Sequence, residues 1–287
     1  MDGWKKAGLV CCSDGEPKAM AIRHHELEEL LNRHGITAEC SLFLYAEQGG
    51  AAGTGIERAE AVNRFFRDPS VDALFDLSGG DMANEVLEHL DFESIRSSHA
   101  RFWGYSDLTT VINGIYAKTG KTSVLYQVKN LVGSCGVEQE KVFFSPAQKE
   151  LFTLPIRFLR GSRLEGTVVG GNIRCLLKLA GTEYFPDLTD KILLLEANSG
   201  RVPQLTTYLS QLSQLGAFRK IRGLVLGTFS QMEREQLQPS AEELVLRRVG
   251  EHLPVVKTDF VGHGPDSRAV LIGGQYCFTG TFGQPIE

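Results

Sequence analysis

The sequence predicts an α/β protein of two units, in which an N-terminal, mostly parallel sheet flanked by helices is followed by a smaller C-terminal α/β unit. Two observations lead to this fold class. Residues 7–127 alternate between short apolar segments and segments with helical spacing, which is typical of a parallel sheet. After an irregular stretch, a second alternation of the same kind extends to the C-terminus. The length of 287 residues is enough for two medium-sized domains.

Short apolar runs beside turn-forming residues predict the strands of the first unit, at 8–12, 71–75, 102–105 and 122–127. Helical spacing of apolar residues predicts helices at 16–34, at 54–67, from residue 81 to about residue 90, and from residue 107 onward. The helix at 54–67 has the clearest start, because Thr54 and Glu57 have the spacing of a capping box.

Residues 129–163 interrupt the alternation and are expected to connect two domains, residues 1–128 and residues 164–287. They contain glycines and prolines and show no clear period, apart from a short helix expected near 147–151. In the second domain, strands are predicted at 166–170, 191–195 and 221–226, and short strands near Val255 and Val270 end the chain. The helices predicted there span 172–179, 202–215 and 241–249.

The composition excludes several classes of function. A net charge of −5, from 30 basic and 35 acidic residues, leaves no basic surplus to neutralise phosphates, so we expect no nucleic-acid partner. We expect no membrane partner, because the sequence shows neither a signal peptide nor an apolar run of transmembrane length. The six cysteines form no Cys-x-x-Cys motif or zinc pattern, which favours reduced thiols, a cytoplasmic location and no metal.

Ser106 is the candidate nucleophile. It follows the strand expected at 102–105 and precedes a helix whose apolar face includes Leu108 and Val111, so it lies at a tight strand-to-helix turn. Such a turn exposes a hydroxyl and leaves helix N–H groups unpaired beside it, where they can hold an oxyanion. The alternative is a serine that only caps the helix.

A serine nucleophile needs a base, usually a histidine, that a carboxylate orients. Glu196 ends an apolar strand, and His263 lies in a glycine-flanked loop after another strand. Strand ends are where α/β folds gather functional side chains. As an alternative, Glu196 is a solvated loop residue or a partner of Arg201. The other histidines are expected on the surface: His24, His25, His34, His89, His99 and His252.

Gly79 and Gly80 form a second candidate oxyanion element, because they end a predicted strand and open a helix. The alternative is a helix entry that merely requires glycine. The pair is too short for a dinucleotide or P-loop motif, and no cofactor is expected. The similar turn Gly170-Gly171-Asn172 is expected to be structural.

Taken together, these segments resemble the LD-carboxypeptidase family, serine peptidases that include muramoyltetrapeptide carboxypeptidases and microcin C self-immunity proteins. The resemblance runs in order along most of the chain. The matching segments are 58–73, Ser-Gly-Gly-Asp at 78–81, Gly-Tyr-Ser-Asp-Leu-Thr at 104–109, Gly-Gly-Asn at 170–172, 192–196, 223–229 and Gly-His-Gly-Pro at 262–265.

The resemblance implies a catalytic triad of Ser106, His263 and Glu196, with an oxyanion hole formed by the N–H groups of Asp107 and Gly80. It implies two α/β domains with the active site in the cleft between them, commonly in a homodimer. The reaction implied is hydrolysis of an L-D peptide bond, with release of terminal D-alanine from a murein tetrapeptide. A small peptide is therefore the expected partner.

Three departures from the family pattern leave the substrate open. Cys-Cys-Ser-Asp-Gly at 11–15 replaces the usual Ala-Pro-Ser, Phe-Leu-Arg-Gly stands at 158–161 in place of a tryptophan segment, and Glu196 is followed by no acidic stretch. The alternatives are an immunity-type peptidase that cleaves a peptidyl-nucleotide, which the short connecting region disfavours, and a catalytically silent two-domain ligand-binding protein. An α/β-hydrolase esterase is disfavoured because Leu108 stands where that motif has glycine.

No residue that binds the substrate carboxylate can be singled out from the sequence. Four arginines are expected near the cleft, where they are either carboxylate ligands or surface ion-pair partners: Arg160, Arg163, Arg174 and Arg268.

Overall fold

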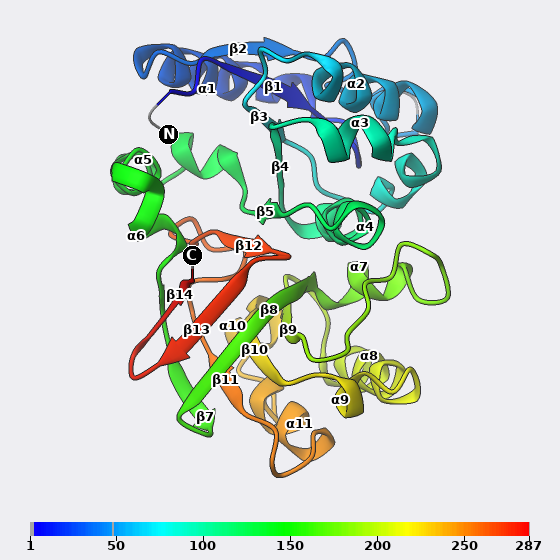
Figure 1. The fold of residues 1–287 in the computed structure, drawn as a ribbon, viewed down its shortest axis with the longest axis vertical. Helices are drawn as coiled ribbons and strands as arrows, with labels where there is room; N and C mark the ends of the chain where they lie inside the picture. Colours follow the sequence, from blue (N-terminus) through cyan, green and yellow to red (C-terminus); the bar gives the residue numbers. More distant parts are fainter. Residues whose placement is uncertain (1–2, 48, 287) are drawn as a thin grey trace.

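The computed structural model describes residues 3–47 and 49–286. It contains two sheets with helices beside them, one above the other in Figure 1. The first sheet has the order β12-β5-β4-β3-β1-β2, and its neighbours are parallel except for β12 against β5. Its strands are β1 (Lys6–Val10), β2 (Thr37–Cys40), β3 (Ala73–Asp76), β4 (Arg101–Gly104), β5 (Ser123–Leu125) and β12 (Val270–Ile272).

Helices cover both faces of the first sheet because alternate residues of its strands point to opposite sides. Residues of α2 and α4 pack with Leu74 and Phe102 on one face, whereas α1, α5 and α6 pack with Phe75 and Trp103 on the other. The bounds are α1 (Ala21–Arg33), α2 (Gly55–Arg67), α3 (Phe92–Ser97), α4 (Thr109–Thr119), α5 (Gly136–Phe143) and α6 (Lys149–Phe152). Short 3-10 helices are η1 (Lys18–Met20), η2 (Ala83–His89), η3 (Ser106–Leu108), η4 (Val128–Val132) and η5 (Pro146–Gln148).

The second sheet has eight strands in the order β6-β14-β13-β8-β9-β10-β11-β7. The four strands from β8 to β11 are parallel, and the outer strands are antiparallel to their neighbours. Its strands are β6 (Leu154–Pro155), β7 (Arg157–Arg160), β8 (Arg163–Asn172), β9 (Ile192–Ala197), β10 (Gly223–Phe229), β11 (Val255–Lys257), β13 (Gln275–Thr279) and β14 (Phe282–Pro285). The helices of this half are α7 (Ile173–Lys178), α8 (Val202–Gln214), α9 (Ala217–Lys220), α10 (Ser230–Arg234) and α11 (Ala241–Arg248).

The predicted two-unit α/β fold is confirmed, and most predicted elements lie within a few residues of the observed ones. Thr54 and Glu57 form the predicted capping box. The elements that were not predicted include β2, α3, α5, α9, α10, β6, β7 and the hairpin of β13 and β14. Short antiparallel strands at a sheet edge take their pairing from distant residues and carry little local periodicity, so the expectation that strands near Val255 and Val270 end the chain is wrong.

The division into residues 1–128, 129–163 and 164–287 remains our proposal. Strands from one segment nevertheless join the sheet of another. Strand β12, from the C-terminal part, adds to the edge of the first sheet, next to β5 (Figure 1). Strands β6 and β7, from the connecting segment, join the second sheet. Strand β12 therefore links the C-terminal part of the chain to the first sheet.

Helix α4 and strand β8 join the two units in the interior. Asn113 donates to the Gly170 carbonyl over 3.0 Å and accepts from the Gly170 N–H over 2.9 Å. The Asn172 N–H donates to Thr109 Oγ1 over 3.0 Å. Gly171 has φ +137, and a Cβ there would lie 2.7 Å from Thr109 Oγ1, so this close approach requires glycine.

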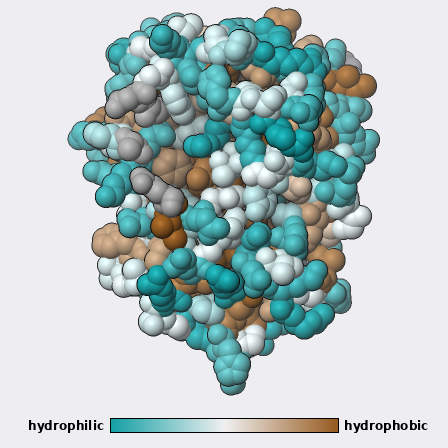
Figure 2. Space-filling model, viewed as in Figure 1, coloured by the Kyte–Doolittle hydropathy of each residue, from teal (hydrophilic) through white to brown (hydrophobic). Residues whose placement is uncertain are grey.

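The face drawn in Figure 2 is largely hydrophilic, with apolar residues scattered between polar ones. Within the described ranges, no helix has both the length and the apolar character needed to cross a membrane.

Candidate active site

The turn that carries Ser106 is strained. Strand β4 ends at Gly104, and Ser106 has φ 58, in the left-handed region that residues other than glycine rarely adopt. Strain of this kind persists only where the surrounding structure enforces it, and it is concentrated at functional sites. Gly104 permits the turn, because a Cβ there would lie 2.7 Å from Leu108 Cβ. The predicted strand-to-helix turn is therefore present, followed by η3 and α4.

The structure brings Ser106, His263 and Glu196 together from three distant segments. Nε2 of His263 lies 3.1 Å from Ser106 Oγ, and Nδ1 lies 3.0 Å from Glu196 Oε2. When the imidazole carries its proton on Nδ1, Nε2 can accept a hydrogen bond from the Ser106 hydroxyl. The Nδ1–carboxylate contact has the distance of an ion pair but not the angle of a hydrogen bond. Catalytic hydrogen bonds are often poorly aligned before substrate binds.

Glu196 is completely buried, whereas the His263 side chain is 19% exposed. Among the described residues, His263 is the only one that forms an ion pair with Glu196. Tyr105, which the sequence analysis did not single out, borders both groups: its ring meets the imidazole edge-on at 5.0 Å between centroids. Burial, and then the negative charge of Glu196, raise the pKa of Tyr105 far above its ordinary value. Its hydroxyl thus remains neutral beside the carboxylate.

Gly80 lies on the wall of the same pocket as Ser106 and His263. Its φ is +135, and a Cβ there would lie 2.1 Å from Cγ of Asp14. Asp14 also accepts a hydrogen bond from the Asp81 N–H over 3.0 Å, which holds this loop in place. Only glycine fits this position, as expected for a backbone element that must approach a substrate closely.

The pocket beside Ser106 has a volume of about 290 Å³. Its lining comes from loops that follow β3, β4 and β5 of the first sheet and β9 and β11 of the second. These are carboxyl ends of parallel strands, the edge where α/β sheets bind their ligands. In the described ranges, no group of three or more His, Cys, Asp or Glu side chains could hold a metal ion.

Comparison with family models decides which family this site belongs to. A model described as the LD-carboxypeptidase N-terminal domain matches residues 7–126, and one described as the LD-carboxypeptidase C-terminal domain matches residues 165–278. The chain belongs to the LD-carboxypeptidase family. The predicted resemblance is thereby confirmed, and with it the assignment to the serine-type carboxypeptidases.

Individual relatives agree with the family models. A Bacillus subtilis protein named "Probable murein peptide carboxypeptidase" is 27% identical over 280 residues, which cover 93% of this chain and 86% of the relative. The murein tetrapeptide carboxypeptidase of Pseudomonas aeruginosa is 26% identical over 275 residues, covering 88% and 87%. The structure of MccF in complex with glutamyl sulfamoyl guanosine has a TM-score of 0.86 at 19% identity, covering 99% of this chain and 96% of that one, and shows the shared fold.

In this LD-carboxypeptidase, the carboxylate of Asp107 holds the turn at Ser106 in place through hydrogen bonds and an ion pair, a role that the sequence analysis missed. Asp107 is fully buried and accepts hydrogen bonds from Ser13 Oγ at 2.7 Å and from the Ala83 N–H at 2.8 Å. Nζ of Lys178, from α7 of the second unit, lies 2.6 Å from the other carboxylate oxygen. Lys178 also donates to the Asp81 carbonyl over 2.8 Å, so it connects the turn with the Gly80 loop.

Lys178→Met should destabilise the LD-carboxypeptidase by about 3 kcal/mol, because it leaves the buried Asp107 carboxylate without its cation. Urea denaturation of both proteins measures this difference. Lys118→Met is the matched control, since Lys118 pairs with Glu183 at the surface and its loss should cost less than about 1 kcal/mol. Equal effects of the two substitutions would contradict this role of Asp107.

The proposed oxyanion role of Gly80 predicts that Gly80→Ala reduces kcat by about 100- to 1,000-fold, the usual effect of losing one such donor. The added methyl group collides with the Asp14 carboxylate at a backbone φ of +135, so the Gly80 loop cannot keep its position. Steady-state kinetics measures the change, with Gly79→Ala as the control, because nothing lies within 4 Å of a Cβ at Gly79. A Gly80→Ala enzyme with unchanged kcat would show that this loop does not contact the reacting group.

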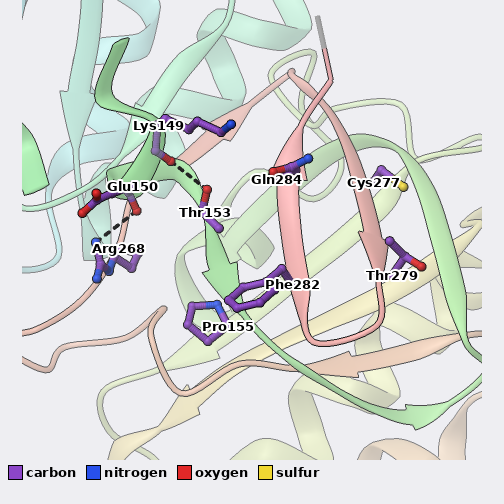
Figure 3. Close-up of a pocket in the computed structure, with 9 residues that line it drawn as sticks. All are labelled: Lys149, Glu150, Thr153, Pro155, Arg268, Cys277, Thr279, Phe282 and Gln284. Atoms are coloured by element: carbon purple, nitrogen blue, oxygen red, sulfur yellow. Dashed lines mark hydrogen bonds between the residues drawn. The ribbon is translucent and has the colours of Figure 1, made fainter. Parts of the chain in front are cut away.

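None of the four arginines expected near the cleft belongs to the lining of the pocket beside Ser106. Arg174 pairs with Asp81, Arg163 pairs with Glu165, and Arg160 donates to the Gly250 carbonyl. Arg268 lines a separate pocket and donates to the Glu150 carbonyl over 3.0 Å (Figure 3). The local sequence could not show which of these arginines line the pocket, because the order of the strands in the sheets determines which loops surround it.

The expectation that His24 lies on the surface is wrong. Its ring is 2% exposed and stacks on Tyr45 at 5.4 Å between centroids. Nε2 of His24 lies 3.3 Å from the buried carboxylate of Glu16, which also contacts Lys129. The predicted helix at 16–34 begins only at Ala21, so Glu16 belongs to a loop that turns inward.

Proposed function

We propose that this protein is a serine carboxypeptidase that hydrolyses the L-D peptide bond of murein tetrapeptide-like substrates and releases terminal D-alanine. Its nucleophile is Ser106, with His263 as base and Glu196 as the orienting carboxylate. The observation that carries the proposal is the chain of contacts from Ser106 Oγ to His263 at 3.1 Å and from His263 to Glu196 at 3.0 Å. The names of the relatives support the substrate class.

In the proposed mechanism, Nε2 of His263 takes the Ser106 proton as Oγ attacks the scissile carbonyl carbon. The N–H groups of Asp107 and Gly80 hold the resulting oxyanion. The imidazolium, stabilised by the Glu196 carboxylate, then gives its proton to the departing amine of D-alanine. Water, activated by the same imidazole, attacks the acyl-enzyme and releases the shortened peptide.

The pocket favours a peptide end over a peptidyl-nucleotide. Its volume of about 290 Å³ lies at the lower limit for small-molecule sites. Tyr105 is the single aromatic residue in the described lining apart from the His263 imidazole, and it is only 3% exposed, so it offers no face on which a base could stack. The alternative of a silent binding protein does not account for the strained Ser106 backbone.

Incubation of the protein with a tetrapeptide that ends in D-alanine tests the proposal, with D-alanine release as the readout. Release from this substrate and none from a peptidyl-adenylate analogue is the expected result. A fluorophosphonate probe should label Ser106, which distinguishes an enzyme from a binding protein. An unlabelled protein that releases no D-alanine would exclude the function.

Activity should fall as the solution becomes acidic, because a protonated His263 cannot accept the Ser106 proton. Measuring kcat/KM from acidic to neutral pH checks this expectation. A flat profile over the range would mean that His263 is not the base.

A role in recycling wall peptides in the cytoplasm, as a homodimer, also belongs to the proposal. The six cysteines are free, and burial raises the pKa of Cys11 and Cys12 well above the ordinary value, so that these thiols stay protonated. Such thiols suit a reducing compartment. Light scattering during gel filtration tests the homodimer, and a mass near the 31.6 kDa of one chain would exclude it.

A further inference from the structure

The wall of the pocket beside Ser106 carries the ammonium group of Lys129. Among the described residues that line it, Lys129 is the only lysine or arginine, and none is an aspartate or glutamate. The other polar groups are neutral amides and hydroxyls, together with the His263 imidazole. A substrate in this pocket therefore meets a single fixed positive charge.

Lys129 is held in position from behind the wall. Its Nζ donates to Glu16 Oε1 over 2.6 Å, and Glu16 does not belong to the pocket lining. Burial alone would raise the pKa of the Glu16 carboxyl, but hydrogen bonds from His24 and Lys129 bring it below its ordinary value. Glu16 is consequently charged near neutral pH and fixes the ammonium group at the edge of the pocket.

The ammonium group of Lys129 retains capacity for a ligand. A lysine has three N–H donors, and within the described ranges only Glu16 accepts a hydrogen bond from Nζ. The side chain is 22% exposed, so it is desolvated enough to strengthen a charge–charge contact and open enough to be reached.

The sheet places Lys129 beside the nucleophile. Strands β4 and β5 are parallel neighbours, and Ser106 follows β4 whereas Lys129 follows β5. Neighbouring strands lie about 4.8 Å apart, so the loops at their carboxyl ends adjoin each other. A group bound by Lys129 is therefore close to the carbonyl that Ser106 attacks.

From this arrangement we infer that Lys129 binds the free α-carboxylate of the residue that is released, an inference that rests on the proposed carboxypeptidase function. An enzyme that removes one C-terminal residue must distinguish a chain end from an internal residue, and the terminal charge is the difference between them. A charge-assisted hydrogen bond from an ammonium group recognises that charge. The four arginines do not line this pocket, so Lys129 is the candidate that remains for binding the terminal carboxylate.

The test compares a tetrapeptide ending in D-alanine with the same peptide ending in D-alaninamide. Binding is measured by calorimetry on Ser106→Ala protein, so that no turnover is needed. The acid should bind more tightly than the amide, and Lys129→Met should reduce this preference by about 10- to 100-fold. In the active enzyme, the same substitution should raise KM for the acid with a smaller effect on kcat. Lys129→Arg should restore part of the preference.

Two further variants separate recognition from structure. Lys129→Met leaves the buried Glu16 carboxylate with only the His24 imidazole as an ion-pair partner. The double substitution Glu16→Gln with Lys129→Met removes both charges and so protects the fold. It should show the same loss of preference. Arg163→Met, at a surface ion pair away from the pocket, should leave the preference unchanged.

The inference would be overturned if the ratio of the affinities for the acid and the amide peptide were the same in Ser106→Ala and in its Lys129 variants. This holds even if the wild type releases D-alanine. If the wild type releases no D-alanine, the carboxypeptidase function fails, whereas the calorimetric ratio still decides whether Lys129 recognises a carboxylate.

Discussion

Ser106→Ala should reduce kcat by about 10⁶-fold, the largest effect that we expect from any single substitution. The loss is this large because, in the proposed mechanism, Ser106, His263 and Glu196 act as one unit, and without the hydroxyl oxygen no acyl-enzyme can form. Peptide binding should persist, since the pocket wall is unchanged. Release of D-alanine, followed over hours at high enzyme concentration, measures the residual rate. Ser97→Ala is the control, because that serine is exposed on α3.

The strained backbone at Ser106 adds a second readout. At φ 58, an alanine keeps the strain and a glycine relieves it, so Ser106→Gly should be inactive and more stable than Ser106→Ala by about 1 kcal/mol. Urea denaturation of the two variants measures the difference. A residual activity within 100-fold of the wild type in either variant would remove Ser106 from the role of nucleophile.

The sequence supplied the fold class and the three central side chains because each leaves a local signal. Apolar alternation predicted the parallel strands, and the turn around Ser106 follows from an apolar run that meets a helical pattern. Glycines on both sides of His263 indicated close approach of the backbone. These signals are short-range, so a single sequence is enough to make these residues candidates, whereas their roles came from the resemblance to the family.

The remaining features depend on contacts between distant residues. Lys129 and Glu16 are 113 residues apart, and Lys178 and Asp107 are 71 apart, so no local pattern links either pair. His24 was placed on the surface because the pattern of its helix gives no hint that Glu16 and Tyr45 cover its ring. Strand order decides which loops meet, and that order is set by long-range pairing.

Glu196→Gln should reduce kcat by about 10⁴-fold while leaving the fold intact. The amide has nearly the same shape, but its NH2 group can face Nδ1 of His263 only if the imidazole adopts the other tautomer, with its proton on Nε2. That tautomer cannot accept the Ser106 proton. The substitution also removes the negative charge that stabilises the imidazolium. Among the described residues, no other carboxylate forms an ion pair with His263.

Glu196→Gln should lower the activity without lowering the free energy of unfolding. The buried Glu196 carboxylate has only His263 as an ion-pair partner in the described part of the chain, so its desolvation opposes folding. Replacing it with an amide removes that cost, and we expect Glu196→Gln to be at least as stable as the wild type in urea denaturation. The control Glu29→Gln, at an exposed side chain on α1, should alter neither property. If Glu196→Gln keeps kcat within tenfold of the wild type, the carboxylate does not orient the base. If the substitution unfolds the protein, Glu196 is a structural residue, because glutamine has nearly the same shape and would destabilise the fold only if the negative charge were required for folding.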